Sequence, residues 1–406
     1  MDPLQYHALA PAGKIGIQTT KPLNTQEELS LAYSPGVALV SEAIAKNPED
    51  VWKYTGRGNT IAIISDGTAV LGLGNIGPLA AMPVMEGKSG LFKKFAGIDC
   101  IPLCLTFKEK PWVEQFIAAV ASMEPNFAAI NLEDIKAPEC FEIQKRLDAM
   151  MDIPVFHDDQ DGTAVILLAA LISALEVVDK KFGEIKLVIN GAGAAGIAFA
   201  RLIHSYGVSK EQIFMCDSQG LITADRGDLN KYKEEFAQKA PAQSLAEAMQ
   251  GADVFVGVSA AGCVSQDMVR GMARDAIVFA AANPVPEIMP DLALAAGAKI
   301  VGTGRSDFPN QVNNLLGFPG IFRGALDARA KKITHAMKIA AAEALAKVLR
   351  EPVEGEARRV LEEAYPNELE KFARTNPIAA DYILPKPFDI RVVPAVAKAV
   401  REIACL

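Results

Sequence analysis

Two pairs of adjacent carboxylates stand just after two short apolar runs. Glu133 and Asp134 directly follow the run FAAINL, and Asp158 and Asp159 follow the run PVF after one histidine. If both runs are strands of one parallel sheet, their carboxyl ends meet at one edge. Four clustered carboxylates repel one another unless a cation lies among them, and oxygen ligands suit Mg²⁺ or Mn²⁺. The pattern predicts a metal site among these two acid pairs; the alternative is that the acids only cap the following helices.

A glycine-rich turn is the second chemical signal. The run KLVIN leads into Gly191, Gly193 and Gly196, with Ala194 and Ala195 before the last glycine, and an apolar helical stretch follows. This is the G-x-G-x-x-G pattern between a strand and a helix, which lets a backbone turn tightly and approach a pyrophosphate. The turn therefore predicts a dinucleotide site; the alternative is a glycine turn used only for packing.

An acidic residue lies where this motif usually has one. Asp217 ends the run QIFMCD, about 20 residues after the glycines, and can accept hydrogen bonds from the adenosine ribose. A carboxylate there repels the 2′-phosphate of NADP, and Ser218 and Gln219 bring no cation. Arg226 is nevertheless near in sequence. The pattern favours NAD and leaves NADP open.

Two side chains have the chemistry to move protons. Lys88 lies between Gly87 and Ser89 in a segment with few other charges, and a partly desolvated lysine can act as a base. Tyr33 precedes a Ser-Pro-Gly turn in an apolar run, where a phenol near a crevice can donate a proton. A solvated lysine and a core tyrosine are the ordinary alternatives.

Three asparagines are candidates for contacts with a small acid. Asn283 ends the run AIVFAAAN, which places its amide at the predicted sheet edge, and Asn313 and Asn314 lie in a turn-rich stretch. Amides can hold carboxylate or hydroxyl groups, so we predict substrate contacts for all three. Purely structural roles are the alternative.

The scaffold that these residues need is an α/β fold. Short β-branched runs alternate with amphipathic stretches, which predicts parallel sheets covered by helices. We expect an N-terminal domain with a parallel sheet (1–160), a Rossmann-type nucleotide domain (161–385) and a C-terminal helical extension (386–406). A buried helix should span 162–178, and the helices after about 330 should pack on the outside. The predicted strands cover 60–65, 100–105, 127–132, 154–156, 186–190, 212–217, 253–259, 276–283 and 299–304.

Composition narrows the class of protein further. Half of the 406 residues are hydrophobic and 22% are charged, so the chain can bury a large core. The net charge of −8 without a basic run disfavours nucleic-acid binding. The chain shows neither a long uncharged apolar run nor a secretory leader, which disfavours a membrane location. Six scattered cysteines without a CxxC pair indicate reduced thiols in the cytoplasm.

The motifs together resemble the short bacterial malic enzymes, which oxidatively decarboxylate malate. The matching segments appear in the family's order and are long and distinctive. They are LAYSPGVA, SDGTAVLGLGNIGPLA, MEGKSGLFKKFAGID, INLEDIKAPECFEI, PVFHDDQDGTA, NGAGAAG, ANPVPEI and TGRSDFPNQVNNLLGFPGIFRGALD.

The resemblance implies a role for each matching residue. Tyr33 corresponds to the proton donor, Lys88 to the general base and Asp158 to the acid that assists the lysine. Metal ligands correspond to Glu133, Asp134 and Asp159, and contacts to substrate and nicotinamide correspond to Asn283 and Asn314. The implied reaction converts malate to pyruvate and CO₂ with NAD or NADP and Mg²⁺ or Mn²⁺, in a homodimer.

The chain departs from its relatives at two positions, and alternative functions stay open. Asp161 replaces a histidine common in bacterial relatives and should add negative charge near the metal. Gln219 replaces a lysine of some NADP-using relatives, which again favours NAD. A malolactic enzyme that retains NADH and a non-catalytic nucleotide sensor are the alternatives.

Overall fold

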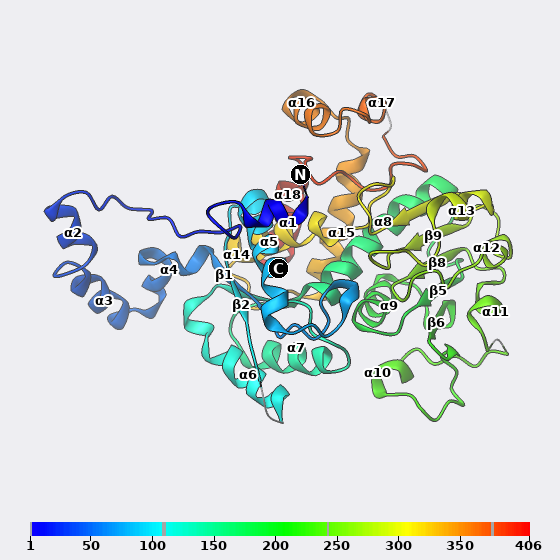
Figure 1. The fold of residues 1–406 in the computed structure, drawn as a ribbon, viewed down its shortest axis with the longest axis horizontal. Helices are drawn as coiled ribbons and strands as arrows, with labels where there is room; N and C mark the ends of the chain where they lie inside the picture. The colour runs from blue at the N-terminus through cyan, green and yellow to red at the C-terminus, as the bar shows by residue number, and fades with distance from the viewer. Residues whose placement is uncertain (1, 108–110, 242, 375–376) are drawn as a thin grey trace.

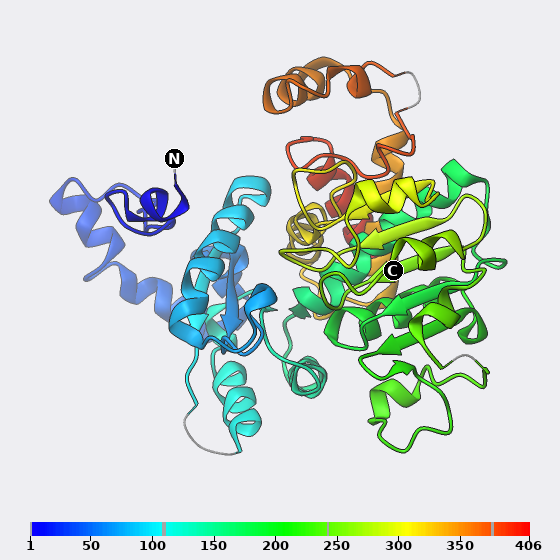
Figure 2. The ribbon, with the colours of Figure 1, turned by 45° about the vertical axis from the view of Figure 1, so that its right-hand side comes forward.

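Two separate sheets organise the chain in the computed structural model, which describes residues 2–107, 111–241, 243–374 and 377–406. Among these residues one sheet has four strands in the order β2-β1-β3-β4, and the other has six in the order β10-β9-β8-β5-β6-β7. Figure 2 shows them in two bodies that lie side by side, one blue to cyan and one mainly green to yellow. The predicted α/β class is confirmed.

The first sheet is entirely parallel. Its inner strand β1 is buried after its first residue because helices cover both faces, which explains its continuous apolar run. The strands are β1 (Thr60–Ser65), β2 (Asp99–Cys104), β3 (Ala129–Leu132) and β4 (Val155–His157), and the accompanying helices are α5 (Pro78–Ala96), α6 (Trp112–Ser122) and α7 (Glu139–Met150).

The second sheet is parallel except at one edge, where β7 pairs antiparallel with β6. The sequence did not predict β7, since two residues carry no periodicity. The strands are β5 (Leu187–Asn190), β6 (Ile213–Asp217), β7 (Gly220–Leu221), β8 (Val254–Gly257), β9 (Ile277–Ala280) and β10 (Ile300–Thr303). The helices are α9 (Ala194–Tyr206), α10 (Lys231–Glu234), α11 (Leu245–Met249), α12 (Gln266–Arg270) and α13 (Pro290–Ala295).

A buried helix follows the last strand of the first sheet. A π-helical turn, η5 (Asp158–Gly162), leads into α8 (Thr163–Val178), which packs against α9 and α15 (His335–Arg350). The stretch Asp158–Val178 is apolar and long enough to cross a membrane, but 72% of its apolar window is buried inside the protein. Packing within the fold therefore explains its composition, as predicted.

Helices near the C-terminus complete the core. Helix α18 (Val392–Ala404) packs on α15 and on α14 (Phe318–Asp327), whose glycines leave no room for a side chain at the contact. Much of α15 is buried, so the expectation that helices after about 330 lie outside is wrong for it. Small alanine side chains are compatible with a close contact between helices as well as with an exposed face, so the composition did not distinguish the two. Helices α16 (Gly355–Ala364) and α17 (Leu369–Phe372) project at the top of Figure 1.

The N-terminal residues form an extended arm. After α1 (Pro3–Ala8), residues 15–54 contain α2 (Gln26–Ala32), α3 (Val37–Lys46) and α4 (Val51–Tyr54), and we call them the N-terminal arm. Figure 1 shows α2 and α3 at the far left, away from both sheets. No residue of 15–54 is buried, so the arm has no core of its own.

Candidate active site

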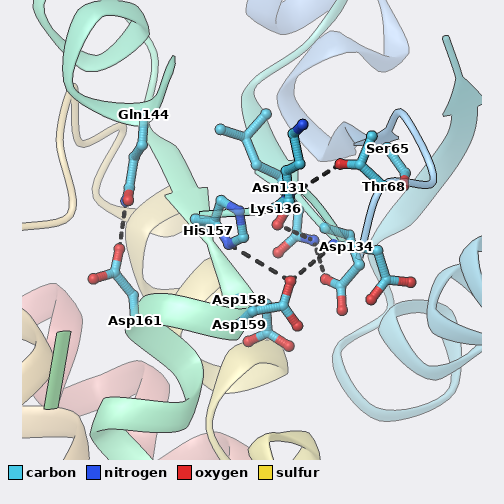
Figure 3. A network of polar contacts seen from close by, with 12 residues as sticks. Ser65, Thr68, Asn131, Asp134, Lys136, Gln144, His157, Asp158, Asp159 and Asp161 are labelled. Atoms are coloured by element: carbon cyan, nitrogen blue, oxygen red, sulfur yellow. Dashed lines mark hydrogen bonds and ion pairs between the residues drawn. The ribbon is translucent and has the colours of Figure 1, made fainter. Parts of the chain in front are cut away.

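The predicted carboxylates converge at the C-terminal edge of the first sheet (Figure 3). Glu133 and Asp134 follow β3, and Asp158 and Asp159 lie in η5 after β4. One oxygen from each of Glu133, Asp134 and Asp159 lies within 4.8 Å of the other two. The backbone N–H of Asp134 donates to Asp159 Oδ2 at 2.8 Å, which locks the two loops together. The strand register therefore produces the acidic cluster that the sequence predicted.

Burial and mutual repulsion disfavour the ionised forms of these three carboxyl groups when no cation is bound. Burial raises the pKa of Glu133 to about 7, with Lys88 opposing the rise and Asp159 adding to it. Burial and Asp159 together raise the pKa of Asp134 to about 8, and burial also raises the pKa of Asp159. Asp134 Oδ2 is buried without a hydrogen-bond partner among the described residues. An all-oxygen donor set with an unpartnered oxygen fits Mg²⁺ or Mn²⁺.

Lys88 projects from α5 into the same cluster. It is buried, its ammonium contacts both Glu133 and Asp158, and it lies 5.0 Å from the ring centroid of Phe318. Burial lowers the pKa of Lys88, but Asp158 and Glu133 outweigh this effect and raise it overall. Burial raises the pKa of Asp158 to about 7, although Lys88 opposes it. The pair thus places a proton carrier beside a carboxylate that can share the proton.

The position of Asp158 depends on a glycine four residues later. A Cβ atom on Gly162 would lie 1.8 Å from Asp158 Oδ1, so only glycine fits there. Asp158 Oδ1 itself is buried and has no hydrogen-bond partner among the described residues. In the π-helical turn, Oδ1 of Asp158 is therefore buried in the interior, and Oδ2 contacts Lys88.

Sequence reasoning missed two buried polar residues beside the cluster. Asn131 in β3 donates from Nδ2 to Glu133 Oε2 at 2.9 Å. His157 lies with Nδ1 at 3.7 Å from Asp159 Oδ2, and burial lowers its pKa to about 4, so it is neutral. Both are polar residues inside or at the end of apolar runs, which was the available signal.

The glycine turn has the geometry that nucleotide binding requires. Gly191 has a φ of +117°. A Cβ on it would lie 2.4 Å from the carbonyl oxygen of Val258, and a Cβ on Gly196 would lie 1.8 Å from that of Gly191. A Cβ on Gly193 meets nothing within 4 Å, and α9 begins there without a side-chain cap. Two glycines therefore allow packing, and the third leaves the free N–H groups of α9 open to a phosphate.

One cavity of about 890 Å³ joins the acidic cluster to the glycine turn. The first domain contributes Lys88, Glu133, Asp134 and Asp159, and the second contributes Gly193, Ala194 and Ala195. The structure thus places a candidate base, a candidate metal site and a candidate nucleotide site around one space.

The three predicted asparagines also line this cavity. Asn283 lies three residues beyond the end of β9, rather than ending the strand, and its side chain is exposed. The side chain of Asn313 accepts the N–H of Leu315 at 2.9 Å and so caps η7 (Asn314–Leu316). Asn313 therefore has a structural role, whereas the side chain of Asn314 makes no such bond with the described part of the chain.

Tyr33 lies outside the cavity of its own chain. It is the C-cap residue of α2 in the N-terminal arm, is 71% exposed, and is absent from the described residues that line the cavity. Within one chain, the structure does not bring the predicted proton donor to Lys88.

Asp161 also has contacts that the sequence did not predict. Its carboxylate accepts hydrogen bonds from Lys338 Nζ and Gln144 Nε2, both at 2.5 Å. Figure 3 shows it directed toward Gln144 and away from Asp134. A lysine from α15 pairs with it on the other side of η5, yet the charge of Asp161 still contributes to the raised pKa of Asp158, so its influence on the metal stays a prediction.

A Rossmann-type sheet whose glycine turn shares a cavity with a lysine and a carboxylate cluster is typical of dinucleotide-binding enzymes. The family model for the malic enzyme N-terminal domain matches residues 12–148. The model for the malic enzyme NAD-binding domain matches residues 160–367. The chain belongs to the malic enzyme family, which confirms the resemblance seen in the sequence.

Individual relatives agree over nearly the whole chain. An NADP-dependent malic enzyme of Rhizobium meliloti is 51% identical over 99% of the chain, which spans only 51% of that protein. An NADP-dependent malic enzyme of Halomonas elongata is 49% identical, with 99% of the chain and 92% of the relative covered. The solved NAD-dependent malic enzyme of Thermotoga maritima is 43% identical, with a TM-score of 0.87 and 99% of both chains covered.

Proposed function

We propose that the protein oxidatively decarboxylates (S)-malate to pyruvate and CO₂ in the cytoplasm and reduces NAD or NADP. The observation that carries this proposal is the shared cavity, where Lys88 and the acidic cluster face the glycine turn. The relatives' names support the same reaction. We further propose domain boundaries near residues 160 and 385, between and beyond the two sheets.

The residues of the chain divide the reaction between them. Lys88 would first pass its own proton to Asp158, and the neutral amine would then take the proton of the C2 hydroxyl. NAD or NADP would supply the acceptor for the hydride of C2. Glu133, Asp134 and Asp159 would hold Mg²⁺ or Mn²⁺, which supplies polarisation of the C2 oxygen in both the oxidation and the loss of CO₂. Tyr33 then donates a proton to C3, which yields pyruvate.

The amides would hold the substrate and the nicotinamide. Asn283 and Asn314 both line the cavity between the acidic cluster and the glycine turn, and amide N–H groups can bind the malate carboxylates or the carboxamide of the cofactor. Asn313 would contribute indirectly, because it caps η7 and so fixes the position of Asn314, the first residue of that turn.

We also propose a homodimer in which the arm of each subunit completes the site of the other. The N-terminal arm exposes many apolar side chains, and unpacked helices of this length are not stable alone. The exposed apolar side chains of the arm are Ile15, Ile17, Leu23, Leu29, Leu31, Tyr33, Val37, Leu39 and Tyr54.

A second exposed apolar surface provides the place where the partner's arm would bind. It lies beside the cavity and comprises Leu71, Leu73, Ile76, Leu79 and Met82, and Leu71 also lines the cavity. An arm docked there would bury both apolar surfaces and would bring Tyr33 of the second copy toward Lys88. This arrangement accounts for a proton donor that is remote from its own site.

The function is tested by mixing the protein with malate, Mn²⁺ and either NAD or NADP. We expect malate-dependent accumulation of reduced nicotinamide with equal amounts of pyruvate and CO₂. Lactate without net reduced cofactor would establish the malolactic alternative instead. Absence of any malate-dependent turnover, with nucleotide binding retained, would favour the nucleotide sensor.

A further inference from the structure

We propose that Glu287 is a positioning residue for the nicotinamide end of the bound dinucleotide. Its buried carboxyl group joins the loops that follow β8 and β9, and both loops line the shared cavity. The proposal rests on the proposed function, because it takes the pyrophosphate to lie at the glycine turn and malate at the acidic cluster. The nicotinamide ring must then lie between the two, beside these loops.

Glu287 accepts hydrogen bonds from both loops. Its Oε1 accepts the backbone N–H of Ser259 at 2.8 Å and the hydroxyl of the same residue at 3.0 Å. Its Oε2 accepts the backbone N–H of Ala282 at 3.0 Å. Ser259 lies two residues beyond the end of β8, and Ala282 lies two residues beyond the end of β9. One carboxyl group thus connects the two loops just after their strands have ended.

The loops need this acceptor because the strands stop pairing there. The ladder between β8 and β9 runs as far as Gly257 and Ala280, and backbone N–H groups beyond it need another partner. Asn190, at the end of β5, extends the network, since its Nδ2 donates to the hydroxyl of Ser259 at 2.8 Å. Three neighbouring strands are therefore tied together at the edge where a Rossmann-type sheet binds its ligand.

The carboxyl group is an expensive way to obtain stability alone. Glu287 has no exposed surface, and burial raises its pKa, although the N–H groups of Ser259 and Ala282 oppose the rise. A buried charge is weak evidence for a gain in folding free energy. A fixed separation between two loops that line a binding cavity gives the same carboxyl group a role in binding.

The position of these loops separates the two halves of a dinucleotide. Ser259, Ala282 and Asn283 line the cavity between the glycine turn and the acidic cluster. A dinucleotide held at the turn by its pyrophosphate has to pass them to bring its nicotinamide toward Lys88. ADP-ribose has the same pyrophosphate but no nicotinamide to place there. Loss of Glu287 should therefore weaken the binding of the dinucleotide and spare that of ADP-ribose.

The experiment compares the binding of NADH and of ADP-ribose to the whole protein, without malate or metal. Fluorescence measures NADH binding and calorimetry measures ADP-ribose binding; NADPH and ADP-ribose 2′-phosphate replace them if the wild-type protein prefers NADPH. We expect Glu287→Gln to weaken NADH binding about tenfold and to change ADP-ribose binding less than about twofold. Glutamine keeps the volume, but its NH₂ group replaces one acceptor oxygen, so one of the two loops loses its partner.

Two further variants complete the design. Gly257→Ala should give the same pattern, because the three atoms nearest to the new Cβ all belong to the side chain of Glu287, with Cδ at 2.4 Å. Asp291→Asn is the matched control, since Asp291 is an exposed acid in the first turn of α13, four residues after Glu287. It should leave both affinities unchanged.

Equal losses for both ligands, or no loss of NADH binding in Glu287→Gln and Gly257→Ala, would overturn the proposal. Thermal melts show which of the two variants keeps the fold, and that variant decides the matter if the other does not. The proposed function can fail separately: a selective loss of NADH binding, with no malate turnover by the wild-type protein, would refute the reaction and leave the role of Glu287 standing.

Discussion

Tyr33 and Lys88 should act across the subunit boundary, and two inactive variants can show it. Tyr33→Phe removes the proposed proton donor, and Lys88→Ala removes the proposed base. Each homodimer should lose about 10²-fold or more in kcat, as expected for loss of a general acid or base. Mixing the two denatured variants in equal amounts and refolding them should then restore activity, because exchanged arms build one intact site in each mixed dimer.

The recovery has a definite magnitude. Random pairing makes about half of the dimers mixed, and in each the Lys88 of one subunit meets the partner's Tyr33 while the other site lacks both. About a quarter of all sites are then native, so turnover should return to about 25% of the wild-type rate. If Tyr33 served its own chain, every site would lack one residue and activity would stay near 1%.

A second mixture controls for refolding losses. In this mixture, a chain with both substitutions is refolded with an equal amount of wild-type chain. About a quarter of the sites stay intact if Tyr33 acts in the partner's site, and about half stay intact if it acts in the site of its own chain. Reduced-nicotinamide absorbance measures turnover, and light scattering checks that both mixtures are dimeric. Activity near 1% in the first mixture and near half in the second would refute the exchanged arm.

Three further outcomes follow from the same geometry. Asp159→Asn should abolish the rise in melting temperature that Mn²⁺ produces in the wild-type protein; an unchanged rise would remove it from the ligand set. The carboxyl groups of the cluster have raised pKa values, so the folded protein keeps protons that the unfolded chain releases. Without metal, the free energy of unfolding should therefore decrease as the pH is raised from about 4 to about 8. Melts with a chelator check this sign, and Mn²⁺ should offset the fall. Gly162→Ala should lower kcat about tenfold or more by displacing Asp158, whereas Gly317→Ala, whose new Cβ has no neighbour closer than 3.6 Å, should not.

Local patterns were sufficient to predict most of the scaffold. Each predicted strand is present with small shifts at its ends, because β-branched runs buried on both faces carry a strong signal. The glycine turn and the acid pairs were predictable for the same reason: parallel strands must end at one edge, whatever packs around them.

What the sequence did not predict depends on partners distant in the chain. Asp161 meets Lys338 across 177 positions, and Asp217 meets Arg226 and Lys233 through a loop whose path no periodicity sets. The pattern around Tyr33 was equally compatible with a core position, since an apolar run does not say which molecule covers it. In each case the residue type was informative, but its charge or contact partner was decided by tertiary packing.

The acidic cluster is difficult to explain as a stabilising feature. Four carboxylates converge on one buried lysine, and burial raises the pKa of each of them, which means that their charged forms weaken the fold. Hydrophobic residues would fill this volume at lower cost, and the position of Asp158 also requires a glycine at 162, which loses more conformational entropy on folding than other residues. The balance changes when a divalent cation and a substrate occupy the cavity, because the charges then have partners. This charge balance supports our proposal that a metal ion and the substrate bind at this edge of the sheet.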